Sequence, residues 1–177
     1  MLLSVQQKYI LEVLRKLGCV RQNQLHALVR GKFQHSDFEI SETRMTAMLR
    51  QLRSGMGDFH VDGNFVYLAR DQPDAARLEA IDVMLELSEG APQGFNVKVD
   101  SPRLLRFALG GDKLKLFSVA KLSYVSDPQQ LQRERSERIV WISDSGTPPE
   151  GLTLPPKHFF AARQADGSHR FYGSNGP

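Results

Sequence analysis

Apolar residues recur at helical spacing twice near the start of the chain. The first set consists of Val5, Tyr9, Ile10, Val13, Leu14 and Leu17. Ser4 and Gln7 form a capping box before this set, and Gly18 supplies a C-terminal stop, which predicts a helix over residues 5–17. A second, shorter helix is predicted over residues 20–29. Its apolar side is formed by Leu25, Leu28 and Val29.

A third helix is predicted over residues 41–54. Its apolar residues form one stripe, at Met45, Met48, Leu49 and Leu52. Ser41 is suited to the N-cap, and Ile40 and Met45 stand at the positions of a hydrophobic staple. Gly55 closes the helix.

Two short runs of β-forming residues follow, at 59–61 and 64–68, with Asp62-Gly63 between them. Asp-Gly in this position predicts a β-hairpin, because a type I′ turn needs a positive φ at both central residues. Three helices followed by a hairpin is the order of a winged helix-turn-helix domain. In such a domain the third helix lies in the DNA major groove, and the hairpin, or wing, contacts the backbone or an adjacent groove. We assign residues 1–70 to this domain.

The remainder predicts an α+β protein. Residues 74–89 are strong helix formers with apolar side chains on two sides, so residues 71–91 form a connecting helix that packs on two neighbours. Its broad apolar surface also makes it the candidate contact for a homodimer, and two-fold DNA sites favour dimers. Residues 92–177 alternate strand and helix patterns, which predicts a small α/β domain whose role the sequence leaves unknown.

Within that domain we expect strands at 95–99, 114–120 and 138–143, a helix at 102–109, and a terminal hairpin at 158–163 and 169–172. Pro102 suits the first position of the expected helix. The polar segment 127–137 is expected to be a connector with helical character, and Trp141 is expected in the core.

Charge adds a weak preference for an acidic partner. The 177 residues carry a net charge of +3, with a pI of about 9.1. Residues 1–70 hold ten Lys and Arg against six acids, and residues 71–177 hold thirteen against fourteen. The predicted winged helix therefore carries +4 and the rest −1. No apolar stretch approaches the ~18–20 residues of a membrane-spanning helix, and we expect a cytoplasmic location.

The candidate DNA contacts lie on the third helix and the wing. The helix face opposite the apolar stripe offers Thr43, Arg44, Ala47, Arg50 and Gln51, with Arg53 near the helix end. Arg and Gln side chains can bond guanine and adenine edges, and Thr can bond phosphate. The wing offers His60, Asp62 and Asn64, and Lys32 is a candidate phosphate contact in the loop before the third helix. Against this stand Asp37, Glu39 and Glu42, which crowd the start of that helix.

Four short segments carry a family resemblance: Gly18-Cys19-Val20, Gln24-Leu25-His26-Ala27-Leu28, Met48-Leu49-Arg50-Gln51-Leu52 and Phe65-Val66-Tyr67-Leu68. Together they resemble winged-helix proteins of mobile genetic elements, in particular the amino-terminal half of the replication-relaxation family and related proteins of plasmids and conjugative transposons. The resemblance covers about 70 residues. It implies that a small α/β domain follows, of a kind that has been likened to a degenerate restriction endonuclease.

That resemblance raises the question of nuclease activity. A nuclease of this type needs one acid, and then an acid and a lysine two residues apart on a neighbouring strand, to hold Mg²⁺ and activate water. Asp100 could be the first acid, but the strand from Lys113 to Phe117 carries no carboxylate, and Asp112 fits a solvated turn better. We therefore expect no enzyme activity and no metal or other cofactor.

Other chemistry is equally unsupported. The five histidines, His26, His35, His60, His158 and His169, lack metal-ligand spacing. The single cysteine, Cys19, excludes an internal disulfide and is expected to fill the core. The most consistent interpretation is a non-catalytic protein that binds double-stranded DNA, as a regulator or accessory factor of a mobile element. The alternative is a protein-interaction module on a winged-helix scaffold, and whether a small molecule binds stays open.

Overall fold

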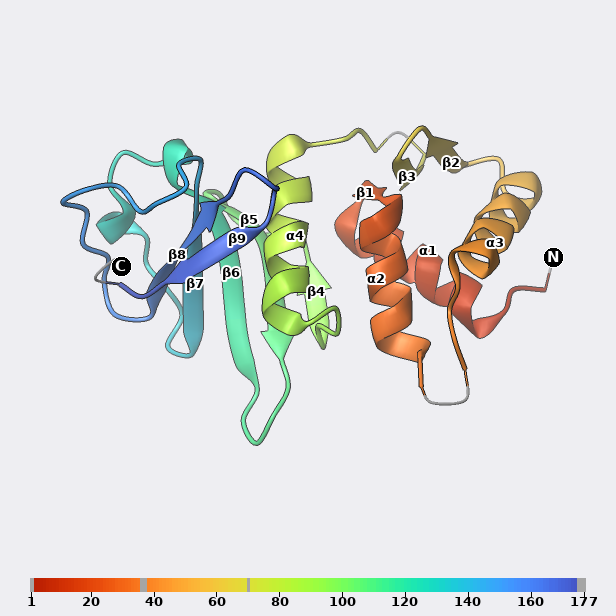
Figure 1. Cartoon of the computed structure of the whole chain (residues 1–177), viewed down its shortest axis with the longest axis horizontal. Helices are drawn as coiled ribbons and strands as arrows, with labels where there is room; N and C mark the ends of the chain where they lie inside the picture. Colours follow the sequence, from red (N-terminus) through yellow and green to blue (C-terminus); the bar gives the residue numbers. More distant parts are fainter. Residues whose placement is uncertain (1, 36–37, 70, 175–177) are drawn as a thin grey trace.

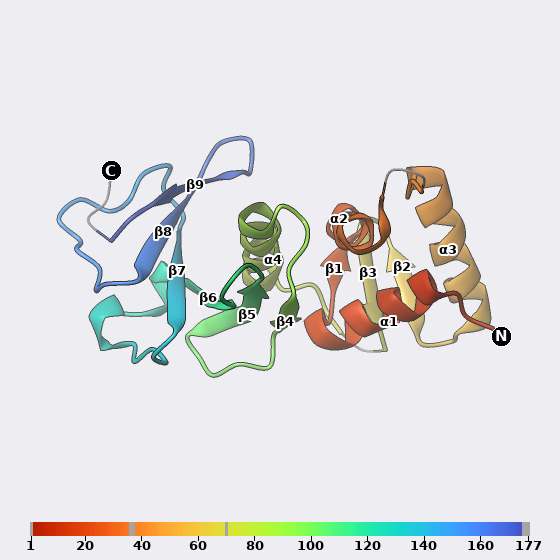
Figure 2. The same ribbon diagram turned by 90° about the horizontal axis from the view of Figure 1, so that it is seen from below.

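The computed structural model of the chain describes residues 2–35, 38–69 and 71–174 (Figure 1). Within these residues the chain forms four α-helices and two β-sheets, so the expected α+β class is confirmed. Three helices and a three-stranded sheet lie at one end, a six-stranded sheet lies at the other, and the fourth helix lies between them (Figures 1 and 2). Asp37 and Arg70, two of the charged residues of segment 1–70, lie outside the described residues.

The amino-terminal elements follow the predicted order with one addition. They are α1 (Val5–Leu17), β1 (Val20–Arg21), α2 (Gln22–Phe33), α3 (Glu42–Gly55), β2 (Phe59–Asp62) and β3 (Phe65–Leu68). The capping box of α1 is formed, because Gln7 N donates to Ser4 Oγ at 3.1 Å and Ser4 N donates to Gln7 Oε1 at 3.0 Å. The three predicted helices and the hairpin are confirmed.

The addition is β1, a strand of two residues that the sequence analysis missed. It pairs antiparallel with β3 through Val20↔Val66 and Arg21↔Phe65, which gives a sheet of order β1-β3-β2. Two residues are too few to display the alternation that marks a strand.

The hairpin is present, but its turn differs from the predicted one. Asp62 pairs with Phe65 as the last residue of β2, so the two turn residues are Gly63 and Asn64. Gly63 adopts a φ of +54°, whereas neither Asp62 nor Asn64 has a positive φ, so the predicted type I′ turn at Asp62-Gly63 is wrong.

Helix α4 (Ala75–Ser88) is covered on both sides by the rest of the chain. Its buried apolar residues are Ala76, Leu78, Ala80, Ile81, Val83 and Met84. One side of the helix contacts α2 and the other contacts the six-stranded sheet, so the expectation of two neighbours is confirmed. The homodimer expected through this helix loses its basis, because the apolar surface on which it rested is buried within the chain.

The carboxy-terminal part is a mixed sheet of order β4-β5-β6-β7-β8-β9. Its strands are β4 (Gly94–Asn96), β5 (Arg103–Leu109), β6 (Lys115–Lys121), β7 (Glu137–Ser143), β8 (His158–Arg163) and β9 (His169–Tyr172). Strands β6, β7 and β8 run parallel, and the other neighbours pair antiparallel. The strands expected at 114–120 and 138–143 and the terminal hairpin are confirmed. The strand expected at 95–99 is confirmed only in part, because β4 ends at Asn96.

The helix predicted at 102–109 is wrong, because this segment is β5. Leu105 and Phe107 are buried in the core shared with α4, whereas Arg106 between them bonds Ser118 and Glu137. This period of two is that of a strand. The helical connector at 127–137 is also wrong, since the chain there forms only the short 3₁₀ turn η2 (Pro128–Gln130), after η1 (Leu122–Tyr124). Residues 92–174, as far as they are described, contain no α-helix, so the expected small α/β domain is instead a six-stranded sheet.

One hydrophobic core connects the two ends of the molecule. It runs from α1, α2 and α3 through Ile81 and Met84 of α4 to Phe107 and Val140 of the sheet. A second, smaller cluster lies around Trp141, Ile139 and Phe160 of the sheet. Trp141 is fully buried, as expected, and its Nε1 donates to Nδ1 of His158 at 3.0 Å. Because the main core is continuous, α4 is part of the packing of both ends.

Candidate nucleic-acid interface

Helix α3 lies at the end of the molecule farthest from the six-stranded sheet (Figure 1), and one of its faces is polar and exposed. Its predicted apolar stripe is confirmed, since Met45, Met48, Leu49 and Leu52 are all buried. All other residues of the helix are exposed, including the five candidates Thr43, Arg44, Arg50, Gln51 and Arg53. The buried stripe therefore fixes which side chains face outward.

The exposed face has two flanks with different surroundings. On one flank, Thr46, Arg50 and Arg53 are spaced at i, i+4 and i+7 and line one shallow hollow of about 220 Å³. The hollow is completed by Leu49 of the same helix, by Gln22 at the start of α2 and by Val61 of β2. Residues of α2, α3 and β2, which are separated in sequence, thus line one hollow together with Arg50 and Arg53.

Gln22 also fixes the β2–β3 turn to the start of α2. Its backbone N donates to Asn64 O at 2.8 Å, and its side-chain Nε2 donates to Gly63 O at 2.8 Å. Asn64 itself has an exposed side chain. The turn is therefore held beside the hollow, and Asn64 keeps its amide group available to a partner.

The other flank of α3 carries Arg44 and Gln51, which have contacts inside the chain. The Arg44 guanidinium lies over the ring of Phe38, 4.3 Å from its centroid. Gln51 Oε1 accepts a hydrogen bond from Gln7 Nε2 of α1 at 2.9 Å. The structure therefore separates these two candidates from Arg50 and Arg53, while Thr43 is exposed near the start of the helix.

Two further candidates lie in settings that the sequence did not reveal. His60 is half-buried and stacks on Tyr67 of β3, with ring centroids 5.2 Å apart. Lys32 lies at the end of α2, where it lines a different hollow with Tyr9 and Phe95. Lys32 is thus not brought together with the α3 candidates.

Among the acidic side chains, Glu42 of α3 lies away from the two arginines along the helix, whereas Asp62 directly follows Val61, which lines the hollow. Glu42 is in the first turn of α3, and the eight residues from it to Arg50 span ~12 Å of helix axis. Glu39 and Asp62 are exposed, and Asp37 is outside the described residues. Arg50 and Arg53 lie in the later turns of α3, far along the helix from Glu42 in its first turn.

Gln22 and Thr46 belong to the site but are not among the candidates predicted from the sequence. Thr46 was recoverable, because it stands four residues before Arg50 on the exposed side. Gln22 was not, because its place depends on the pairing of β1 with β3, two elements about 45 residues apart in sequence.

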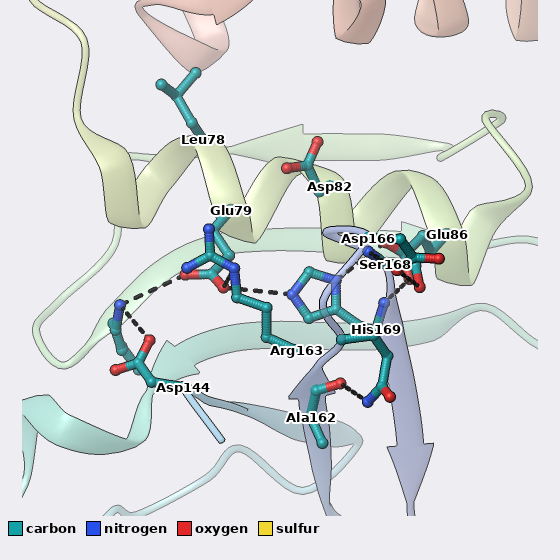
Figure 3. A network of polar contacts seen from close by, with 12 residues as sticks. Leu78, Glu79, Asp82, Glu86, Asp144, Ala162, Arg163, Asp166, Ser168 and His169 are labelled. Atoms are coloured by element: carbon teal, nitrogen blue, oxygen red, sulfur yellow. Dashed lines mark hydrogen bonds and ion pairs between the residues drawn. The ribbon is translucent and has the colours of Figure 1, made fainter. Parts of the chain in front are cut away.

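A separate cluster of charged side chains holds α4 to the sheet (Figure 3). His169 of β9 is almost fully buried; its Nδ1 lies 3.0 Å from Glu86 Oε1 and its Nε2 lies 3.5 Å from Glu79 Oε1. Glu79 also contacts Lys121 at 3.5 Å and Arg163 at 3.4 Å. Burial lowers the pKa of His169, but hydrogen bonds to Glu79 and Glu86 outweigh it and raise the pKa above its usual value.

The charged side chains of this cluster form ion pairs with one another. Burial opposes ionisation of Glu79, but the hydrogen bond from His169 and the nearby Arg163 and Lys121 lower its pKa. Lys121 has a second partner, Asp144, at 2.9 Å. Each charged group thus faces an opposite charge, an arrangement that stabilises the contact between α4 and the sheet.

A second buried ion pair lies on the opposite face of the sheet. Glu137, at the start of β7, receives two hydrogen bonds from Arg103 of β5, each of 2.8 Å. Asp100, the candidate first acid of a nuclease, is exposed nearby and shares a hollow with Arg103, Arg106 and Glu134. Within the described residues, no group of three or more His, Cys, Asp or Glu side chains is placed to hold a metal ion.

Comparison with known proteins gave no match to any family model, curated protein or solved structure. In the described parts of the chain, no helix is long and apolar enough to cross a membrane.

Proposed function

We propose that the chain is a non-catalytic DNA-binding protein whose amino-terminal part is a winged helix-turn-helix domain. In this proposal α3 lies in the major groove and the β2–β3 hairpin is the wing. The observation that carries it is the hollow where Arg50 and Arg53 of α3 meet the start of α2 and the hairpin. These three elements are the ones that such a domain directs at DNA.

The element order supports this assignment. The chain runs α1-β1-α2-α3-β2-β3 with sheet order β1-β3-β2, and in this sheet β2 packs against α3, β3 against α1 and β1 against α2. An α-helix with its side chains is ~10–12 Å wide and fits the ~12 Å major groove. Arg50 is the candidate for guanine edges, while Arg53 and Thr46 are suited to phosphates. Asn64 lies where the wing would meet the backbone.

The position of the site leaves room for a duplex. Helix α3 and the hairpin lie at one end of the molecule, and α1, α2 and α4 separate them from the six-stranded sheet (Figures 1 and 2). A regulator or accessory factor, for example one of a mobile element, would use such a domain to position the rest of the chain at a DNA site.

The test is a titration of a fluorescent random duplex, read by anisotropy at low and at moderate salt. We expect binding that weakens with salt, because displaced counterions drive phosphate contacts. Arg50→Ala/Arg53→Ala should bind at least ~10-fold more weakly, with a salt slope smaller by about 2 if both arginines contact phosphates and less if Arg50 contacts a base.

The matched control is Lys8→Ala/Arg15→Ala, which removes two exposed positive charges from α1. Its affinity should stay near that of the unmodified chain. Equal losses of DNA affinity in the two double variants would mean that net charge alone, and not the α3 surface, determines binding. Salt-insensitive binding, or none at low salt, would contradict the proposal.

A second candidate function is protein binding through the amino-terminal end. Leu2 is fully exposed and Val5 is 65% exposed, on the same end of α1 that contacts α3 through Gln7. An exposed apolar pair of this kind suits a protein contact. If DNA does not bind, Leu2→Ser/Val5→Ser should reduce the capture of a protein partner, whereas Arg50→Ala/Arg53→Ala should not.

A further inference from the structure

A hollow of about 390 Å³ lies where the amino-terminal helices meet the segment that leads from α4 into β4. It is lined by Tyr9, Glu12 and Lys16 of α1, by Leu28, Gly31 and Lys32 of α2, and by residues 90–95. Its volume lies within the range of small-molecule sites. The hollow is distinct from the α3 surface and does not depend on the proposed DNA contact.

One corner of the hollow is formed by two backbones in contact. A Cβ added to Gly31 would lie 2.0 Å from Gly90 O and 2.7 Å from the carbonyl carbon of Gly90, so no larger residue fits at position 31 without a shift. Gly90 is itself fixed, with a φ of +79° and its N donating to Leu85 O at 2.9 Å. The corner is therefore shaped by the backbone before any ligand arrives.

The polar groups of the lining are mainly donors. Lys16 and Lys32 contribute two ammonium groups. Burial, with a smaller contribution from Glu12, raises the pKa of Tyr9 to about 12, so its hydroxyl stays protonated at neutral pH and can donate. The one lining carboxylate, Glu12, accepts from Lys16 Nζ at 2.6 Å. A lining of this kind favours an acceptor-rich, negatively charged group.

The apolar part of the lining includes two aromatic side chains. The rings of Tyr9 and Phe95 come from different ends of the molecule, and Leu28 lies with them. Tyr9 is held edge-on against Phe33, with ring centroids 5.4 Å apart, and the Lys16 ammonium lies 5.5 Å from the Phe95 centroid. Flat, fixed rings of this kind suit a planar ligand.

We propose that this hollow binds a small organic anion that carries a planar ring. The anionic group, a phosphate or a carboxylate, lies between Lys16 and Lys32, and the ring lies against Tyr9 and Phe95. Because α1 and α2 supply one side and residues 90–95 the other, the ligand joins the amino-terminal helices to the six-stranded sheet.

The experiment is calorimetry on the full chain without DNA. The probes are adenosine 5′-monophosphate, 4-hydroxybenzoate, uncharged adenosine and inorganic phosphate. We expect one of the two ringed anions to bind with a Kd below about 1 mM, and adenosine and phosphate to bind at least ~10-fold more weakly. The first two probes distinguish a phosphate ester from a carboxylate.

Lys32→Ala should weaken the affinity for the bound probe at least ~5-fold, because it removes a positive charge from the hollow. The control is Lys8→Ala, which changes an exposed lysine of α1 outside the hollow and should leave the affinity unchanged. Lys32 is on the surface, so its loss should not unfold the chain. Failure of both ringed anions to bind, binding of phosphate alone with equal affinity, or equal effects of the two variants would overturn the proposal. These results are read without DNA, so they leave the DNA-binding proposal to its own test.

Discussion

The ion pair of Glu137 and Arg103 makes a quantitative prediction about acid stability. The Glu137 side chain is fully buried, and that of Arg103 is 10% exposed. Besides Arg103, Glu137 accepts hydrogen bonds from the Ser118 hydroxyl and from the backbone N of Glu134. Burial alone would raise the pKa of this carboxyl, but these hydrogen bonds outweigh burial and lower the pKa to about 2.

The size of the effect follows from proton linkage. Glu137 has a pKa of 4.5 before it is perturbed and about 2 in the folded chain, which corresponds to about 3 kcal/mol of stability at neutral pH. Because the folded pKa is lowered, this contribution is fully present above pH 4.5 and is lost as the pH falls towards 2. At pH ~3, about 1 kcal/mol remains.

The perturbation is Glu137→Gln, which keeps the shape of the side chain and removes its charge. We expect the free energy of unfolding, measured with urea at pH 7, to fall by about 3 kcal/mol, since Arg103 loses its buried partner. The difference between the two proteins should shrink to about 1 kcal/mol near pH 3.

The control is Glu150→Gln, which removes an exposed carboxylate from the loop before β8 and should change stability by less than ~0.5 kcal/mol. A Glu137→Gln difference that stays constant from pH 7 to 3 would refute the reasoning. So would a loss no larger than that of the control.

Two further predictions concern the contacts of α4 and of the segment that follows it. His169→Gln should lower the free energy of unfolding, measured with urea, at pH 6 but only a little at pH 9. The raised pKa of His169 stabilises the folded chain below the unfolded pKa, and this stabilisation is lost as the pH rises through the folded pKa. A difference between the two proteins that does not depend on pH would contradict this. Gly31→Ala should lower stability by about 1–3 kcal/mol, because its Cβ would meet Gly90 O at 2.0 Å, whereas Gly57→Ala meets nothing within 4 Å. Equal melting temperatures for the two alanine variants would show that the close approach costs nothing.

Local patterns predicted the amino-terminal elements well. The stripe from Met45 to Leu52 and the Ser41 cap both depend on residues within one helix, and both are present. The β-hairpin is present too, although its turn residues are Gly63 and Asn64 rather than Asp62 and Gly63. These features are visible in sequence because neighbours along the chain determine them.

The wrong predictions concern segments whose structure depends on contacts with residues far away in the sequence. Pro102 and the leucines after it suggested a helix, but pairing with β4 and β6 makes this segment β5. Lys32 was placed with the DNA contacts, yet the close approach of Gly31 to Gly90 places it beside Phe95 instead.

The buried charges were invisible in sequence for the same reason. Glu137 and Arg103 are 34 residues apart, and His169 and Glu79 are 90 residues apart. Each of these side chains resembles an ordinary surface charge until its strand or helix is placed in the fold.

The most direct test of DNA binding by α3 is an amide chemical-shift titration of the labelled chain with a short duplex. If α3 binds DNA, the largest changes fall on residues 42–55 of α3, on Gln22 and on the β2–β3 turn, with small changes in the six-stranded sheet. Changes confined to the sheet, or no changes at a duplex concentration that saturates the anisotropy signal, would contradict it.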